Sequence, residues 1–204
     1  MVDNMEFHRL AMVEFFRRRD RPLDDDSILA ASGRRDVDIL AEHFPELSAP
    51  ERGALESEWE HIFWHLYGPH RRLLPGLADL IGRAVDHGIV CAVASSASRA
   101  SIHWTLDDFP IARHLGAIVS AADVRNGKPA PDVFLEAAAR CGVQPEHCVV
   151  FEDAPAGVEA ARRAGMRAIV LTTSFPAHVF AKFDNVVAVA RNFEELADGF
   201  PFDR

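Results

Sequence analysis

The first third of the chain carries apolar side chains at the spacing of an α-helix. Met5, Leu10, Val13 and Phe16 recur in this way, behind an Asp3-x-x-Glu6 sequence that is typical of a capping box. Further helical stretches are predicted near residues 28–31, 36–44 and 48–66, until Gly68-Pro69 interrupts the pattern. We therefore expect an all-helical module over residues 1–72.

From Pro75 onward, short apolar runs alternate with amphipathic segments. The runs predict strands at residues 89–94, 117–120, 148–151, 168–171 and 185–189. The segments between them predict helices at residues 77–86, 100–107, 131–140 and 156–164. Alternation of this kind indicates an α/β fold, with a Rossmann-like parallel sheet covered by helices on both faces. We assign this core to residues 73–204.

Composition narrows the classes of partner. The chain of 204 residues has 31 acidic and 22 basic side chains and a net charge of −9, which disfavours binding to nucleic acid or to an anionic membrane. Asp3 and Glu6 stand where a signal peptide would be basic, and no apolar run is long enough to span a bilayer. We expect a cytoplasmic monomer whose partner is a small molecule.

Two carboxylates follow the predicted strand 148–151 directly: Glu152 and Asp153. Ligands of open α/β sheets bind at the carboxyl ends of the strands, and Mg²⁺ prefers oxygen ligands that include few carboxylates. We expect Asp153 to bind Mg²⁺ directly and Glu152 to do so through water, because successive strand residues point to opposite faces. The alternative is that Asp153 caps the next helix.

Two further segments offer groups for a phosphate. The strand 89–94 leads into Ser95 and Ser96, whose hydroxyls and backbone N–H groups could hold phosphoryl oxygens. The alternative is an ordinary helix N-cap at Ser96 or Ser98. Lys128 lies on a turn between Gly and Pro and could neutralise a phosphate, or it could be a solvated loop lysine.

Together these segments resemble the haloacid dehalogenase (HAD) superfamily, in its β-phosphoglucomutase-like branch with a helical cap. The resemblance rests on the order and spacing of Ala94-Ser-Ser96, Gly127-Lys-Pro-Ala-Pro-Asp132 and Phe151-Glu-Asp-Ala-Pro-Ala-Gly-Val-Glu-Ala-Ala161. It implies that Ser95 binds the transferring phosphoryl group, that Lys128 stabilises it, and that Glu152 and Asp153 hold Mg²⁺.

The family opens with an apolar strand that ends in Asp-x-Asp-Gly and supplies the nucleophile and the general acid/base. Here residues 1–8 resemble the stretch just after that motif, so the first central strand and both aspartates are missing. We interpret this as a gene model begun at an internal Met and expect the chain as given to be inactive. A shortened pseudoenzyme that only binds phosphorylated metabolites is the alternative.

The helical module offers candidate substrate contacts. Arg34 and Arg35 lie where the family's cap carries its specificity loop and could grip a sugar phosphate, unless they form a solvated turn. Mutase relatives carry an arginine further along this loop, where Asp36 stands here, so we favour a phosphatase over a mutase. His8 matches a hinge-region histidine of the branch, with a plain helix-face histidine as the alternative.

The resemblance and the residues together predict a Mg²⁺-dependent phosphatase of a small phosphorylated metabolite, with a sugar phosphate as the expected substrate. Its reaction would pass through an aspartyl phosphate on an aspartate that is absent from this chain. Phosphoglucomutase-like transfer and non-catalytic binding remain the two rival functions.

Overall fold

The computed structural model describes residues 2–196. Their helices are α1 Met5–Arg17, α2 Asp25–Ala31, α3 Asp36–His43, α4 Ala49–Tyr67, α5 Leu77–Asp86, α6 Arg99–Leu106, α7 Asp132–Cys141 and α8 Pro155–Arg163. Their strands are β1 Cys91–Ala94, β2 Leu115–Val119, β3 Val149–Glu152, β4 Arg167–Leu171 and β5 Val186–Ala190. None of the described helices is long and apolar enough to cross a membrane.

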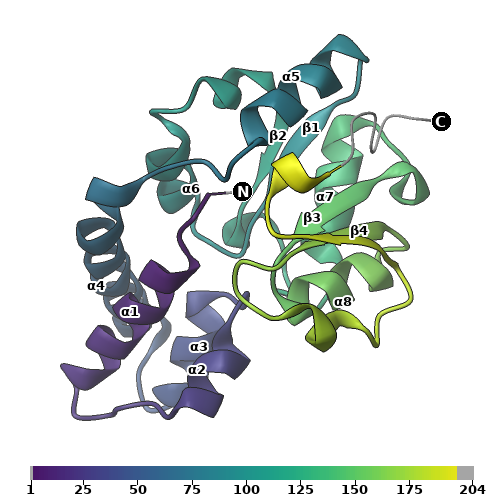
Figure 1. The fold of residues 1–204 in the computed structure, drawn as a ribbon. Coiled ribbons are helices and arrows are strands. Elements are labelled where there is room, and N and C mark those ends of the chain that lie inside the picture. The colour runs from purple at the N-terminus through teal and green to yellow at the C-terminus, as the bar shows by residue number, and fades with distance from the viewer. Residues whose placement is uncertain (1, 197–204) are drawn as a thin grey trace.

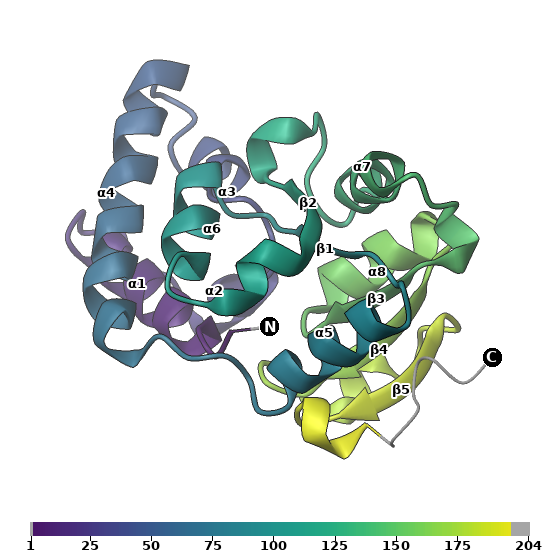
Figure 2. The same ribbon diagram turned by 90° about the horizontal axis from the view of Figure 1, so that it is seen from above.

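Helices α1–α4 form a module beside the strands, as both overall views show (Figures 1 and 2). They pack around a core of their own in which Phe15, Phe16 and Leu40 are fully buried. Helix α4 begins with a capping box in which Ser48 and Glu51 satisfy each other's backbone N–H groups. The module therefore has the hydrophobic core that the helical pattern predicted. The capping box expected at Asp3-x-x-Glu6 does not form, because Asn4 precedes α1 without a side-chain cap and the Asp3 carboxylate pairs with Arg72 instead.

The start of the described chain lies beside the segment that connects this module to the strands. Val2 and Leu73 form an antiparallel bridge, and the Asp3 N–H donates to the Arg72 carbonyl at 3.2 Å. The boundary that we propose between residues 72 and 73 falls in this connecting segment.

All pairings among the described strands β1–β5 are parallel, which confirms the predicted α/β class. Strand β1 pairs with β2, and β4 pairs with both β3 and β5. Alternate residues of β4 face opposite cores: Ala168 and Val170 contribute to the core with α7 and α8, whereas Ile169 and Leu171 contribute to the core with α5. Helices thus cover both faces, as period-two alternation requires.

The parallel strands of the described residues are divided between two sheets. The described strands form a two-stranded sheet and a three-stranded sheet, and no strand pairing joins β1 to β3. The reason is that no described strand lies between them, although residues of both strands contribute to the same two cores. Strand β1 also begins at Cys91 rather than at residue 89, because Ile89 and Val90 are exposed.

Candidate active site

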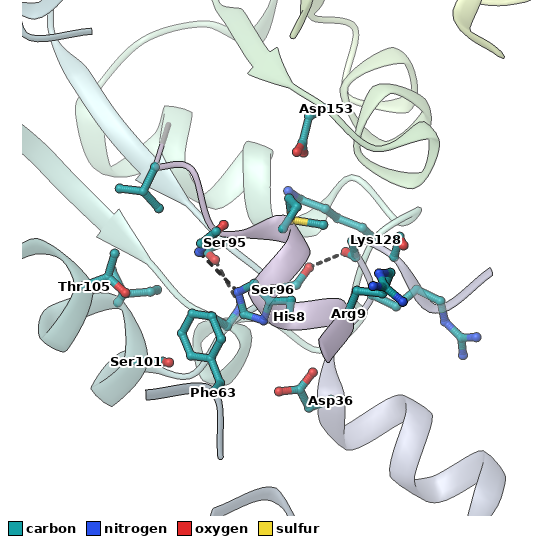
Figure 3. A pocket seen from close by; sticks show the side chains of 18 of the residues that line it. His8, Arg9, Asp36, Phe63, Ser95, Ser96, Ser101, Thr105, Lys128 and Asp153 are labelled. Atoms are coloured by element: carbon teal, nitrogen blue, oxygen red, sulfur yellow. Dashed lines mark hydrogen bonds between the residues drawn. The ribbon is translucent and has the colours of Figure 1, made fainter. Parts of the chain in front are cut away.

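A pocket of about 280 Å³ lies between the helical module and the carboxyl ends of β1 and β3 (Figure 3). Its lining comes from segments far apart in the sequence. The predicted site residues among them are His8, Arg34, Ser95, Ser96, Lys128, Glu152 and Asp153. Arg35 is the one predicted site residue that does not line it.

Lys128 and Glu152 form a buried ion pair at one end of the pocket, with side chains 8% and 9% exposed. The ammonium group of Lys128 also lies 4.9 Å from the centre of the Phe134 ring. The second carboxylate oxygen of Glu152 accepts the N–H groups of Asp153 and Ala154 at 3.0 and 3.1 Å. Lys128 is therefore not a solvated loop lysine, and both oxygens of Glu152 already have partners.

The position of the Glu152 carboxylate requires a glycine at residue 157. Gly157 is buried in the first turn of α8, and a Cβ atom there would overlap the Glu152 carboxylate. The position of the Glu152 side chain thus explains why a glycine stands at position 157.

Asp153 is held by the hydroxyls of the β4 connection. Its Oδ2 accepts the Oγ1–H of Thr173 at 2.9 Å and the Oγ–H of Ser174 at 2.5 Å. Helix α8 is instead preceded by Ala154, which offers no side-chain cap, so Asp153 is not the helix N-cap. Thr173 also lines the pocket, and only its place after a strand could have indicated this from sequence.

The surroundings of Glu152 and Asp153 indicate whether these carboxylates could bind a cation. Among residues 2–196 no group of three or more His, Cys, Asp or Glu side chains is arranged to hold a metal. Mg²⁺ keeps several waters and needs only one or two carboxylates, so the Oδ1 atom of Asp153 fits that ion. Glu152 could contribute only through water while Lys128 and two N–H groups occupy its oxygens.

Ser95 and Ser96 follow β1 and face the pocket. The Ser95 N–H continues the strand pairing to Val119, and its Oγ accepts the Ala97 N–H at 3.1 Å. The N-cap of α6 is Ser98, whose hydroxyl accepts the Ser101 N–H at 3.1 Å. Ser96 instead donates to the Gly33 carbonyl at 2.8 Å, which ties the loop after β1 to the helical module.

The two predicted arginines have separate surroundings. Arg34 lines the pocket and pairs with Glu42 at 2.9 Å. Arg35 makes a bidentate ion pair with Asp38, donates to the Val124 carbonyl at 3.3 Å, and packs against Gly127 so closely that a Cβ there would lie 2.6 Å from its Nε. Arg35 therefore connects the helical module to the loop that carries Lys128.

His8 lies on the pocket wall rather than on an exposed helix face. Its ring stacks on Phe63 with centroids 3.9 Å apart, and its Nε2 lies 3.2 Å from the Asn4 side-chain amide. Burial lowers the pKa of His8 to about 4. The imidazole is therefore neutral near pH 7, when it can donate or accept a proton in a hydrogen bond but carries no charge.

Asp36 opens α3 on the side of the pocket that the helical module forms. Burial, the Glu56 carboxylate and the Glu60 carboxylate raise its pKa to about 7. Figure 3 shows Asp36 and Asp153 at opposite ends of the view, with His8 between them. The pocket thus has acidic groups at both ends.

Comparison with known proteins points to one family. The haloacid dehalogenase-like hydrolase family matches residues 3–165. The chain is 28% identical, over 90% of its length and 86% of the relative's, to the validoxylamine A 7'-phosphate phosphatase of Streptomyces hygroscopicus subsp. limoneus. It is 46% identical to the fructose-1-phosphate phosphatase YqaB of Escherichia coli, over 38% of this chain and 42% of that protein.

Solved structures show the same fold over nearly the whole chain. CbbY of Rhodobacter sphaeroides, solved in complex with phosphate, superposes with a TM-score of 0.80 at 26% identity, over 97% of this chain and 92% of that one. A HAD hydrolase of Entamoeba histolytica superposes with a TM-score of 0.84 at 21% identity, over 97% and 91%. The chain belongs to the haloacid dehalogenase-like hydrolases, a family whose relatives here include phosphatases of small metabolites.

Proposed function

We propose that this protein is a Mg²⁺-dependent phosphatase of a small phosphorylated metabolite, with a sugar phosphate as the expected substrate. The observation that carries the proposal is the convergence of Ser95, Lys128 and Asp153 on one pocket. A hydroxyl, a cation and an available carboxylate oxygen there match what a phosphate and a hard cation require.

Each of these groups has a defined role in the proposal. Asp153 would hold Mg²⁺, which supplies positive charge to the phosphoryl oxygens when bound. Ser95 would bind a phosphoryl oxygen, and Ser96 would order the same loop through its bond to Gly33. Lys128 would bring a cation to the phosphate while Glu152 holds its ammonium group in place.

The helical module would close the pocket over the substrate. His8 and Phe63 contribute its wall, and the Trp64 Nε1–H donates to the Ser101 hydroxyl at 3.1 Å across the interface with α6. Because the chain's own residues line the pocket, we propose that the protein acts as a monomer. Its substrates would be found in the cytoplasm.

Asp36 bears on the choice between phosphatase and mutase. A transfer that passes through a doubly phosphorylated species needs a second phosphate site at the far end of the pocket. A carboxylate at that end, with Glu60 beside it, repels such a group. This favours phosphate release, which an assay of free phosphate against isomer formation distinguishes.

The second candidate function is a protein that binds phosphorylated metabolites without hydrolysing them, and the carboxylates of the pocket favour it. Those lining the described pocket are Asp36, Glu60, Glu152 and Asp153. Glu152 is bound to Lys128, and Asp153 is the proposed metal ligand. The family's nucleophile would have to be a further aspartate, and no segment of these 204 residues resembles the motif that supplies it.

Binding to the chain as it exists tests the proposal directly. We expect isothermal titration calorimetry to detect glucose 6-phosphate only when Mg²⁺ is present. Asp153→Asn should weaken this binding by about tenfold or more, because it removes the carboxylate that holds the ion. Asp184→Asn, at an exposed carboxylate outside the pocket, is the control and should bind as the parent does. Equal affinity with and without Mg²⁺ would refute the metal role.

A further inference from the structure

The Asp36 carboxylate has no hydrogen bond or ion pair with any other residue in the described part of the chain, although Asp36 lines the pocket. It lies in the first turn of α3, and Figure 3 shows its carboxylate on the side of the pocket away from Asp153. A half-buried carboxylate without a partner is stabilised by a ligand that supplies one. The side chain is thus placed to interact with something that enters the pocket.

The charges around Asp36 are of its own sign. Glu56 and Glu60 both oppose its ionisation, and Glu60 accepts only the Ser98 hydroxyl. The two nearby guanidinium groups of the loop are already engaged, since Arg34 pairs with Glu42 and Arg35 with Asp38. Arg9 also lines the pocket but pairs with Glu6, and Arg35 offsets the charge of Glu56 only in part. Among the described residues, none of these guanidinium groups forms an ion pair with Asp36, Glu56 or Glu60.

We propose that Asp36 determines substrate specificity by selecting phosphate monoesters whose distal part carries a protonated amine. This inference rests on the proposed function, because it assumes that the phosphate lies near Ser95, Lys128 and Asp153. An ammonium group beside Asp36 would form a charge-assisted hydrogen bond and offset the repulsion from Glu56 and Glu60.

Other distal groups fit this wall less well. A second phosphate would meet two carboxylates at close range and be repelled. A hydroxyl would donate to a carboxylate or to an amide oxygen, so it would make little use of the charge on Asp36. Only a cation uses both the missing hydrogen-bond partner and the excess of negative charge.

The test uses aminoalkyl phosphates of increasing chain length, each compared with the alkyl phosphate of the same length. Dissociation constants are measured by calorimetry on the 204-residue chain with Mg²⁺ at pH 8, where the amines are protonated and Asp36 is mostly ionised. At the length that spans the pocket, we expect the amine to bind about 10- to 100-fold more tightly. Asp36→Asn should remove this preference while leaving the affinity for the alkyl phosphate within about twofold.

Asp26→Asn is the matched control, because Asp26 is an exposed carboxylate of the same helical module and does not line the pocket. It should keep the full preference for the amine. If the parent chain binds both series equally, or if Asp36→Asn keeps the preference, this inference is wrong although phosphate binding stands. If neither series binds with Mg²⁺, the proposed function and this inference fall together.

Discussion

Lys128 and Glu152 lie 24 residues apart in sequence and form a buried ion pair beside the pocket. The same Glu152 side chain accepts the N–H groups of Asp153 and Ala154. One carboxylate therefore fixes both the lysine and the turn that presents Asp153. Since each partner is almost enclosed, neither charge can return to water without disturbing the site.

Removal of the lysine charge should destabilise the fold. Lys128→Met leaves Glu152 buried without its cation, so we expect a loss of about 3–5 kcal/mol in the free energy of unfolding, measured with urea. The double variant Lys128→Met/Glu152→Gln should lose less than the sum of the two single variants, by about 1–3 kcal/mol. Strict additivity would mean that the two side chains do not interact in solution.

Gly157 should not tolerate a methyl group. Gly157→Ala places a Cβ atom within the Glu152 carboxylate, so we expect about 1–3 kcal/mol of destabilisation and weaker binding of glucose 6-phosphate with Mg²⁺. Gly82→Ala, in α5, is the comparison, because nothing lies within 4 Å of its Cβ position. That variant should be neutral or more stable by up to about 1 kcal/mol.

The raised pKa of Asp36 predicts a specific pH dependence. Between the ordinary aspartate pKa of 3.8 and the raised pKa of about 7, the folded protein binds more protons at this site than the unfolded chain. The contribution of Asp36 to stability is therefore full below about pH 4 and is lost as the pH rises through 7. Relative to the parent, Asp36→Asn should gain stability between pH 4 and pH 8.

Urea unfolding of the two proteins across this range measures that difference. The gain should amount to roughly 4 kcal/mol at most, at about 1.4 kcal/mol per pKa unit. Glu56 and Glu60 face the same carboxyl, so Glu60→Gln should reduce the dependence in part. A difference that does not vary with pH would contradict the raised pKa.

His8 should give stability the opposite pH dependence, in a more acidic range. Its pKa of about 4 lies below the ordinary histidine pKa of 6.5, so the unfolded chain binds more protons between these values. The contribution of neutral His8 is present above pH 6.5 and is lost as the pH falls through 4. His8→Phe keeps a ring against Phe63 and should remove roughly 3 kcal/mol of this acid sensitivity, again by urea unfolding.

The chain should not hydrolyse p-nitrophenyl phosphate with Mg²⁺. Among the described carboxylates that line the pocket, Glu152 is paired with Lys128 and Asp153 is the proposed metal ligand. Asp36 and Glu60 lie on the side of the helical module, so none of the four is placed as a nucleophile for a phosphate beside Ser95. Release of p-nitrophenolate gives the measurement. Robust turnover that Asp153→Asn abolishes would show that some group of this chain does serve as nucleophile.

Local pattern predicted much of the architecture. The helical period of residues 4–68 predicted the helical module, and the strand–helix alternation after Pro75 predicted the α/β core. Both could be predicted because side-chain periodicity depends on neighbours in the chain. Boundaries shifted by a few residues, as at β1, where exposure of Ile89 and Val90 depends on distant packing. The separation of the strands into two sheets likewise depends on which strands become neighbours.

The sequence by itself determined the α/β class and identified Ser95, Lys128 and Asp153 as candidate site residues. Their residue types, and their positions in the connections between elements, limit the chemistry that they can perform. Only the tertiary structure decided that Lys128 is buried on Glu152, that Arg35 bonds to the Val124 carbonyl instead of lining the pocket, and that Asp36 faces it without a partner. These outcomes depend on contacts across the interface between the helices and the sheets. No local pattern encodes such contacts, because burial and charge pairing arise when distant segments meet.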